Sequence, residues 1–474
     1  MPASLVMTRR RALQALHGAL ALMLVACASD GGASTGIRPF TNPGSCPVTP
    51  VALPATDVTV TLDPTQRFQT IQGFGTTQRL FDDPHTTETF DAVTRRATAT
   101  PPAAEQAKIL DALYVDLGLT RVRFHPEGLE TVNDNVDPLS TDLSKFDFSW
   151  KASDGHIDAV KTLMSRGLTT YYASPLSLPS FMNESNPDEY VEWAMVLLRH
   201  WREQGLEMPY YSLLNEPGYY QGVKTWSGTW LRDVAKLLGA RLRAEGFATK
   251  LVVPDDVSPV DAYARLQVIL ADPDARQYVG AVAYHLYGRG SEAQIAQLAK
   301  QYGIPVWMTE FSTPNDWRAW AGVMHELLAT DDVSAIDYMW GFFGDWDHSQ
   351  LIQLKVAGGN YAGFDLTRHY YVMGQYSRFV RPGAIRIAAT SSDTAVKVVA
   401  FLTGTTPVVV VTNTGTRDHG VRFELGAAAP CGTRVQAVRT SDTESWSALP
   451  DVTLDQPRFA TTVPAGSVTT FAGK

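Results

Sequence analysis

Between about residue 70 and residue 382, the sequence alternates short apolar runs with longer amphipathic ones. Each apolar run is four to six residues long and rich in β-branched or aromatic residues, which is typical of buried strands. The eight runs cover residues 70–75, 121–125, 169–174, 210–215, 250–254, 281–285, 306–310 and 335–340. The pattern therefore predicts eight strands in this part of the chain.

The segments between these runs have helical spacing, as in residues 103–117, 155–166, 187–203, 226–245 and 291–302. Ser291 is the expected N-cap of the last of these helices. Repeated strand–helix units predict an α/β fold, a (β/α)8 TIM barrel with parallel strands buried on both faces. An open doubly wound sheet is the alternative. It is disfavoured because Gly73-Phe74-Gly75 lacks the third glycine of a dinucleotide-binding turn.

After Pro382 the pattern changes to short alternating runs, such as 396–401 and 407–412, separated by Gly, Thr, Asp and Pro. This alternation predicts an antiparallel β-sandwich. Residues 58–62 have the same character, although they precede the first barrel strand. We therefore expect a side domain built from both chain ends, residues 56–68 and 383–474, attached to a barrel formed by residues 69–382.

The first 26 residues resemble an export signal, with Arg9, Arg10 and Arg11 followed by an apolar stretch. The stretch ends in Leu24-Val25-Ala26-Cys27, which resembles the bacterial lipobox, in which the cysteine is lipidated. A plain secretory signal that contains a cysteine is the alternative. Residues 27–55, with many Gly, Ser, Thr and Pro, are expected to be a flexible tether. The sequence thus predicts an exported lipoprotein with a lipid anchor in the cell envelope, at the outer membrane or cell surface.

Charge and cysteine content narrow the function further. The chain has 40 Lys and Arg against 49 Asp and Glu, a net charge of −9. Removing residues 1–26 takes away three arginines and no acid, which leaves 37 − 49 = −12. An acidic chain without a long basic run argues against nucleic-acid binding. No CxxC pair is present, and Cys46 and Cys431 are a disulfide candidate in an exported protein, with two free thiols as the alternative.

Two glutamates stand at the ends of predicted strands. The fourth strand ends in Asn215-Glu216-Pro217, and the seventh ends in Thr309-Glu310-Phe311. Active sites of such barrels lie at the C-terminal ends of the strands, so both side chains are expected at one barrel mouth. A pair of carboxylates there can cleave a glycosidic bond. For either glutamate alone, a solvated loop position is the alternative.

At this point the sequence resembles glycoside hydrolase family 30, a family of retaining β-glycosidases in clan A. The resemblance covers nearly the whole mature chain. It is carried by an ordered series of segments, Ile71-Gln72-Gly73-Phe74-Gly75, Arg121-Val122-Arg123, Ala173-Ser174-Pro175, Asn215-Glu216-Pro217, His285-Leu286-Tyr287-Gly288, Trp307-Met308-Thr309-Glu310 and Tyr376-Ser377-Arg378-Phe379-Val380-Arg381-Pro382-Gly383.

The resemblance implies a role for each residue of the site. Glu216 would be the general acid/base and Glu310 the nucleophile, about 5–5.5 Å apart as in retaining enzymes. Asn215 would bind the sugar 2-hydroxyl, and Arg123 would hold Glu310 ionised, with a surface ion pair as its alternative. Tyr287 would donate a hydrogen bond to Glu310. His285 would support the site from behind, with a buried core histidine as the alternative. Trp340 would form the floor under the sugar, with ordinary packing as the alternative.

Aromatic residues crowd the loops after the strands. Tyr219 and Trp346 are candidate sugar contacts, and packing is the alternative for them and for Tyr220, Trp226, Trp317, Phe342 and Phe343. Asp345, Asp347 and His348 are interpreted as a polar loop or as substrate contacts rather than as a metal site, and no metal or cofactor is expected. The absence of GxSxG and HExxH motifs argues against a typical α/β-hydrolase or zincin.

The substrate stays open at this stage. Glucuronoxylan-cleaving members of the family place basic residues after strand eight, whereas residues 341–345 of this chain contain no Arg or Lys. We therefore expect a monomeric enzyme acting on a polysaccharide or oligosaccharide of xylan, β-1,6-glucan or galactan type. A non-catalytic glycan-binding lipoprotein of the cell surface is the alternative.

Overall fold

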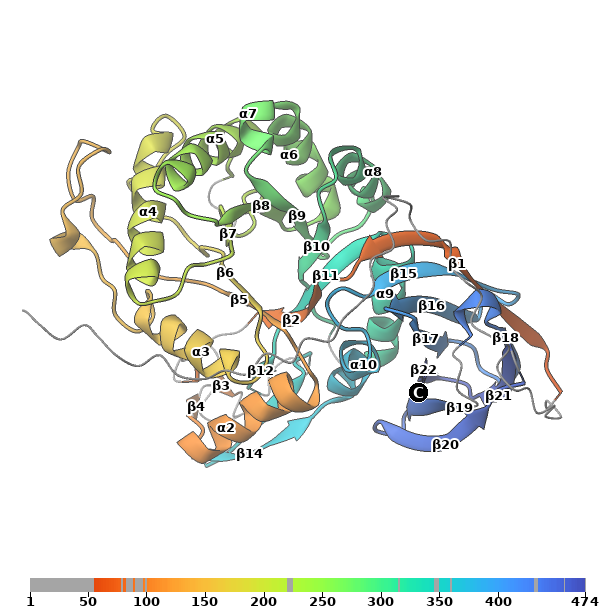
Figure 1. Ribbon diagram of the computed structural model, residues 1–474. Coiled ribbons are helices and arrows are strands. Elements are labelled where there is room, and N and C mark those ends of the chain that lie inside the picture. Colours follow the sequence, from red (N-terminus) through yellow and green to blue (C-terminus); the bar gives the residue numbers. More distant parts are fainter. Residues whose placement is uncertain are drawn as a thin grey trace, which may run out of the picture. The chain divides into compact units, whose positions relative to one another are not determined.

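Eight parallel strands form a closed barrel in the computed structural model (Figure 1). In chain order they are β2 (Gly73–Thr77), β5 (Arg121–Phe124), β6 (Thr170–Ala173), β7 (Tyr210–Ser212), β8 (Lys250–Asp256), β9 (Val279–His285), β10 (Val306–Glu310) and β11 (Val333–Tyr338). Parallel pairing of β11 with β2 closes the ring. Each predicted apolar run overlaps one of these strands, so the predicted TIM barrel is confirmed.

The structure describes residues 55–77, 80–81, 88–89, 97–98, 100–219, 225–313, 316–344, 349–358, 360–429, 434–455 and 457–473. The predicted signal peptide (1–26) and nearly all of the predicted tether (27–55) lie outside these residues. So do Cys27, Cys46 and Cys431, and among the candidate sugar contacts Trp346 and Tyr220. Within the described part of the chain, no helix is long and apolar enough to cross a membrane.

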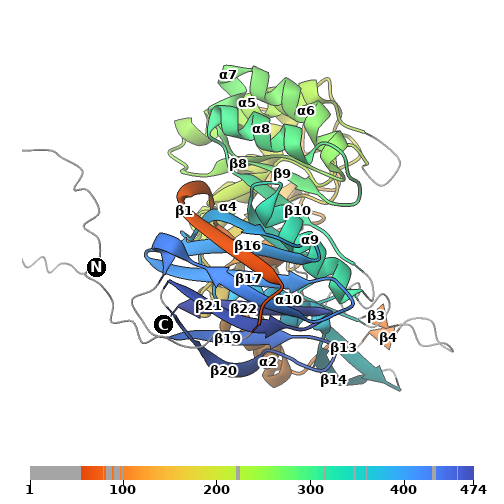
Figure 2. The same cartoon turned by 90° about the vertical axis from the view of Figure 1, so that its right-hand side faces the viewer.

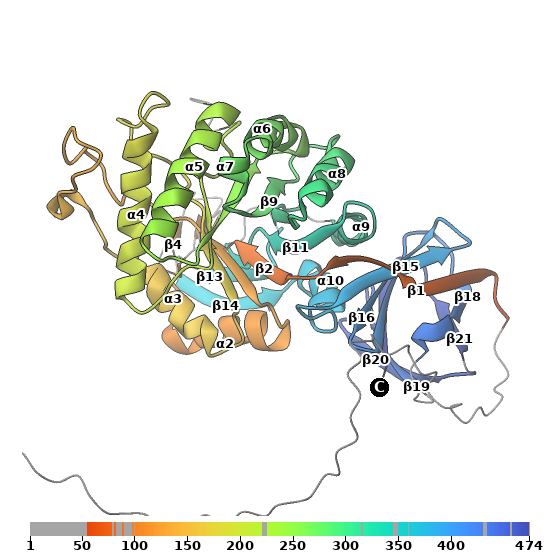
Figure 3. The same ribbon diagram turned by 45° about the horizontal axis from the view of Figure 1, so that its top comes forward.

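Helices surround the barrel (Figure 3). They are α2 (Ala103–Asp111), α3 (Asp154–Met164), α4 (Pro187–Glu203), α5 (Gly228–Ala244), α6 (Pro259–Ala271), α7 (Pro273–Arg276), α8 (Glu292–Tyr302), α9 (Trp317–Ala329) and α10 (Arg368–Ser377). α4 begins with Pro187, whose ring favours the first helical position. The expected helix 103–117 ends earlier as an α-helix and continues as a π-helical turn, Ala112–Asp116. Ser291 is the N-cap of α8, but its side chain makes no capping hydrogen bond.

A buried ion pair lies among apolar side chains of the barrel strands. Arg121 is fully buried and makes a two-pronged ion pair with Asp337, with N–O distances of 3.0 and 2.9 Å. Its guanidinium also lies 4.0 Å from the ring centre of Trp307. A Cβ atom on Gly75 would lie 2.4 Å from an Asp337 carboxylate oxygen. Gly75 is therefore required by close packing in the barrel, and Gly73-Phe74-Gly75 belongs to strand β2 rather than to a nucleotide-binding turn.

The side domain is one nine-stranded sheet that includes β1 (Val58–Thr70) from the N-terminal part (Figure 2). The other strands are β15 (Ile385–Ser391), β16 (Val396–Thr403), β17 (Thr406–Asn413), β18 (His419–Glu424), β19 (Arg434–Thr440), β20 (Ser447–Thr453), β21 (Arg458–Val463) and β22 (Ser467–Gly473). β1 pairs antiparallel with β15 and parallel with β18, so both chain ends build the domain as expected. The edge strands β20 and β21 contact each other, and the sheet encloses a core that contains Phe423, Phe459 and Phe471.

Two small sheets were not expected from the sequence. β12 (Phe342–Phe343), β13 (Ile352–Ala357) and β14 (Asn360–Leu366) follow the last barrel strand, and β3 (Glu88–Thr89) pairs with β4 (Ala97–Thr98). The barrel and the side domain are joined by packing as well as by the chain. Trp446 Nε1 donates to the carbonyl oxygen of Tyr371 at 2.7 Å, and a Cβ on Gly374 would overlap the Trp446 ring.

Candidate active site

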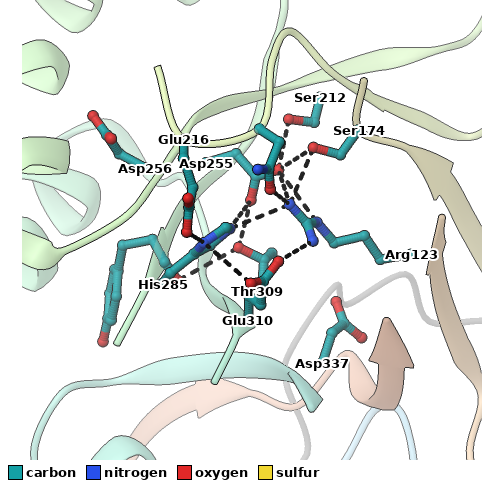
Figure 4. A network of polar contacts seen from close by, with 12 residues as sticks. Arg123, Ser174, Ser212, Glu216, Asp255, Asp256, His285, Thr309, Glu310 and Asp337 are labelled. Carbon is teal, nitrogen blue, oxygen red and sulfur yellow. Dashed lines mark hydrogen bonds and ion pairs between the residues drawn. The ribbon is translucent and has the colours of Figure 1, made fainter. Parts of the chain in front are cut away.

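Glu216 and Glu310 lie at the mouth of the barrel and face each other (Figure 4). Glu310 is the last residue of β10, whereas Glu216 follows β7 after a short buried segment. A carboxylate oxygen of Glu216, a ring nitrogen of His285 and a carboxylate oxygen of Glu310 all lie within 4.8 Å of one another. Glu216 has a φ of 48°, a left-handed conformation that is costly for a residue other than glycine. One oxygen of each carboxyl group therefore lies within 4.8 Å of the other, so the two groups can reach the same bond of a ligand.

Arg123, on β5, connects the residues of the site. Its Nη1 lies 2.7 Å from Glu310 Oε2, and its Nη2 donates to Asn215 Oδ1 at 2.5 Å. The side chain is completely buried. Burial alone would lower the pKa of Arg123, but the charges of Asp255 and Glu310 raise it. The guanidinium is therefore a permanent cation that fixes one oxygen of Glu310 and the amide of Asn215 in place.

Asp255 is the central residue that sequence reasoning missed. It lies near the end of β8, is fully buried, and accepts hydrogen bonds from the hydroxyls of Ser174, Ser212 and Thr309 at 2.6, 2.8 and 2.5 Å. Burial would raise the pKa of Asp255, but the Arg123 charge and the contact with His285 hold it well below its ordinary value. The predicted strand ended at residue 254. Extending the search for strand-end acids by one position would have found Asp255.

His285, the last residue of β9, lies between carboxylates. Its Nδ1 is 2.8 Å from Glu216 Oε1, and its Nε2 is 3.4 Å from Asp255 Oδ1. Burial, and to a smaller extent the Arg123 guanidinium, would lower the pKa of His285. The charge of Glu310 and the hydrogen bonds to Asp255 and Glu216 outweigh both and raise it to about 9. The imidazole is therefore protonated at neutral pH, when it donates to Glu216.

The aromatic candidates differ in exposure. The Tyr287 hydroxyl donates to Glu310 Oε1 at 3.0 Å, and the residue is 45% exposed. Trp340 is 7% exposed and stacks on Phe343 with ring centres 5.2 Å apart, whereas Tyr219 is 57% exposed. Trp226, Trp317, Phe342 and Phe343 are buried, as expected for packing residues. Tyr287 thus contacts Glu310 directly, and Tyr219 lies three residues after Glu216 in the same loop.

The distances among Glu216, His285 and Glu310 are also short enough for a metal ion. Both Glu310 oxygens, however, already have donors in Arg123 and Tyr287. The raised pKa of His285 keeps a proton on the ring that a metal would have to displace. The donor set therefore fits a network of ion pairs better than a metal centre.

No protein-family model matches the sequence. The glucuronoxylanase XynC of Bacillus subtilis is 26% identical over 349 residues, which are 67% of this chain and 77% of that protein. The endo-1,6-β-D-glucanase of Neurospora crassa is 24% identical over 402 residues, 74% of this chain and 79% of that one. The crystal structure of a family 30 endoxylanase from Clostridium papyrosolvens C71 has a TM-score of 0.69 and 22% identity, and covers 88% of this chain and 100% of that one.

The barrel, the paired glutamates and these relatives identify the chain as a glycoside hydrolase. They also confirm the resemblance to glycoside hydrolase family 30 that the ordered motifs predicted. The solved family 30 structures share this fold, a TIM barrel with a separate and mostly antiparallel sheet.

Proposed function

We propose that this chain is a retaining β-glycosidase that works by double displacement. Glu310 attacks the anomeric carbon, and the bond to the leaving oxygen breaks as Glu216 protonates that oxygen. Glu216 then takes a proton from water, and the resulting attack releases the sugar from Glu310 with its original configuration. The single observation that carries this proposal is the approach of both carboxyl groups to within 4.8 Å at the barrel mouth.

The surrounding residues have the chemistry that this reaction needs. The Arg123 and Tyr287 contacts give each oxygen of Glu310 a donor and fix its orientation. Arg123 holds the amide oxygen of Asn215, which leaves the amide N–H groups to donate to a sugar hydroxyl. Trp340 supplies an apolar ring for the apolar face of a pyranose, and Tyr219 an exposed one farther along the loop.

We propose a β-linked polysaccharide as the substrate, of xylan, β-1,6-glucan or galactan type. The relatives named above are enzymes for glucuronoxylan and β-1,6-glucan. Residues 339–344, which follow the last barrel strand, contain no Arg or Lys that would pair with a uronic acid. Product chromatography after incubation with each polysaccharide distinguishes these substrates. A wild-type chain that binds a glycan but releases no product from any of them would favour the non-catalytic alternative.

We also propose that the protein is exported and anchored in the cell envelope through Cys27. The proposal rests on the signal-like residues 1–26 and on the lipobox-like Leu24-Val25-Ala26-Cys27. Mass spectrometry of the N-terminal peptide, compared with a Cys27→Ser variant, tests it. An unmodified Cys27 in the membrane fraction would contradict the lipid anchor.

The catalytic proposal is tested with Glu310→Ala and Glu216→Ala, and with the exposed Glu203→Gln on α4 as the control. Both alanine variants should lose most activity, and the control should keep it. On a substrate with an activated leaving group, azide should restore turnover in both alanine variants but give different products. In Glu216→Ala, azide attacks the glycosyl–Glu310 ester without needing a base, so the glycosyl azide keeps the β configuration. In Glu310→Ala, azide attacks the anomeric carbon in place of the missing carboxylate, so the glycosyl azide is inverted. Full activity in Glu310→Ala would refute the assignment.

A further inference from the structure

Asp256, the last residue of β8, follows Asp255 in the chain, but its side chain points away from the two glutamates (Figure 4). The side chain is completely buried, and its Oδ1 accepts the backbone N–H groups of Gly218 and Val257, each at 2.9 Å. Gly218 lies two residues after Glu216. Asp256 therefore holds the backbone of the loop that carries the proposed acid/base, although the double-displacement steps themselves make no use of it.

Arg265, on α6, links Asp256 to a second point of the same loop. Its Nη1 lies 2.9 Å from Asp256 Oδ2, and its Nε donates to the carbonyl oxygen of Trp226 at 2.9 Å. Trp226 in turn donates its backbone N–H to the carbonyl oxygen of Pro217 at 2.8 Å. The Asp256–Arg265 pair thus contacts the loop at residue 218 and at residue 226.

The pair approaches the loop backbone so closely that a glycine is required there. A Cβ atom on Gly218 would lie 2.7 Å from Asp256 Oδ1 and 2.9 Å from Arg265 Nη1. Burial raises the pKa of Asp256, while the charge of Arg265 and the hydrogen bonds from Val257 and Gly218 act in the opposite direction. The pair is therefore a buried contact whose geometry depends on both side chains and on the absence of a side chain at residue 218.

Glu216 needs such support because its own backbone conformation is unfavourable. Its φ of 48° lies in the left-handed region, and a residue other than glycine stays there only where its surroundings hold it. The N–H of Glu216 donates to the carbonyl oxygen of Asp255 at 2.9 Å. Two consecutive residues of β8 therefore hold the loop, Asp255 through its carbonyl group and Asp256 through its side chain.

We propose that Asp256 and Arg265 are positioning residues that keep the carboxyl group of Glu216 at the leaving oxygen of the substrate. This inference rests on the proposed role of Glu216 as the acid/base. If the loop relaxes, Glu216 moves and protonation of the leaving oxygen slows, because a displacement of about 1 Å can cost about 100-fold in rate. Glu310 is held separately by Arg123, so its attack on the anomeric carbon should not depend on the pair.

The test compares two leaving groups on one glycan. An oligosaccharide of the polysaccharide that the enzyme cleaves requires protonation of its leaving oxygen, whereas a dinitrophenyl glycoside of the same sugar releases a stable anion without it. Asp256→Asn, which places an amide donor against the guanidinium, and Arg265→Met should each lower kcat/KM on the oligosaccharide by about 10- to 100-fold. On the dinitrophenyl glycoside the loss should be less than about 3-fold, because the acid is not needed there.

The control variant breaks another ion pair between a carboxylate and an arginine. Asp332 lies 2.7 Å from Arg386 and precedes β11, at the end of the barrel opposite the glutamates. Asp332→Asn should therefore leave kcat/KM unchanged on both substrates. If Asp256→Asn fails to fold, Gly218→Ala decides instead, because its methyl group displaces the pair from the backbone without removing a charge.

Glu216→Ala, measured beside these variants, separates the positioning role from the proposed function. It should show the same dependence on the leaving group, and more strongly. Equal losses on both substrates in the Asp256 and Arg265 variants, or no loss on either, would overturn the positioning role. A Glu216→Ala variant that loses the same activity on both substrates would instead overturn the proposed role of Glu216 as the acid.

Discussion

The protonated state of His285 predicts a loss of stability at alkaline pH. Its pKa is raised from 6.5 to about 9 by the folded site, and the residue is completely buried. A raised pKa means that the folded state binds the proton more tightly than the unfolded chain does. The resulting stabilisation is fully present below about pH 6.5, declines as pH rises, and is lost above about pH 9. A shift of this size corresponds to about 3 kcal/mol at most.

Other groups titrate over the same pH range, so the measurement must isolate His285. We suggest urea unfolding of the wild type and of His285→Gln at intervals from pH 6 to pH 10. The difference between their free energies of unfolding should fall by about 3 kcal/mol between pH 6.5 and pH 9, and should then stay constant. Parallel pH profiles for the two proteins would refute the idea that Asp255, Glu216 and Glu310 hold a proton on His285.

Three further substitutions test single contacts. Arg123→Met should lower kcat by about 100-fold or more. It should also destabilise the fold by about 3–5 kcal/mol, because Asp255 loses its buried cation. Initial-rate assays and urea unfolding measure the two effects, and an unchanged kcat or free energy of unfolding would contradict the prediction. Tyr287→Phe removes one hydrogen bond to a carboxyl group. Steady-state kinetics should therefore show a loss in kcat/KM of about 10- to 100-fold, with an unchanged unfolding temperature. A lower unfolding temperature would instead indicate that the hydroxyl supports packing. Gly75→Ala places a methyl group 2.4 Å from an Asp337 oxygen and should lower the unfolding temperature; a variant as stable as the wild type would disprove the need for glycine there.

Strand ends were a productive guide to the site because a parallel barrel brings all of them to one face. Residues Arg123, His285 and Glu310 lie within or at the end of their strands, where periodicity places them directly. Asp255 was missed because β8 continues two residues beyond the predicted end. The small sheet β12–β14 was missed because its strands follow the last barrel strand and lie outside the strand–helix repeat that marks the others.

The sequence by itself determined the order of the strands and the construction of the side domain from both chain ends. It also placed the two glutamates at the ends of strands. These features follow from local periodicity and from motifs in a fixed order. Only the tertiary structure decided which charged side chains contact one another. Asp255 and His285 are 30 residues apart in sequence, and neither strand reveals that their side chains meet beneath Glu216. Electrostatic coupling depends on distance and burial, and both are set only when the barrel closes.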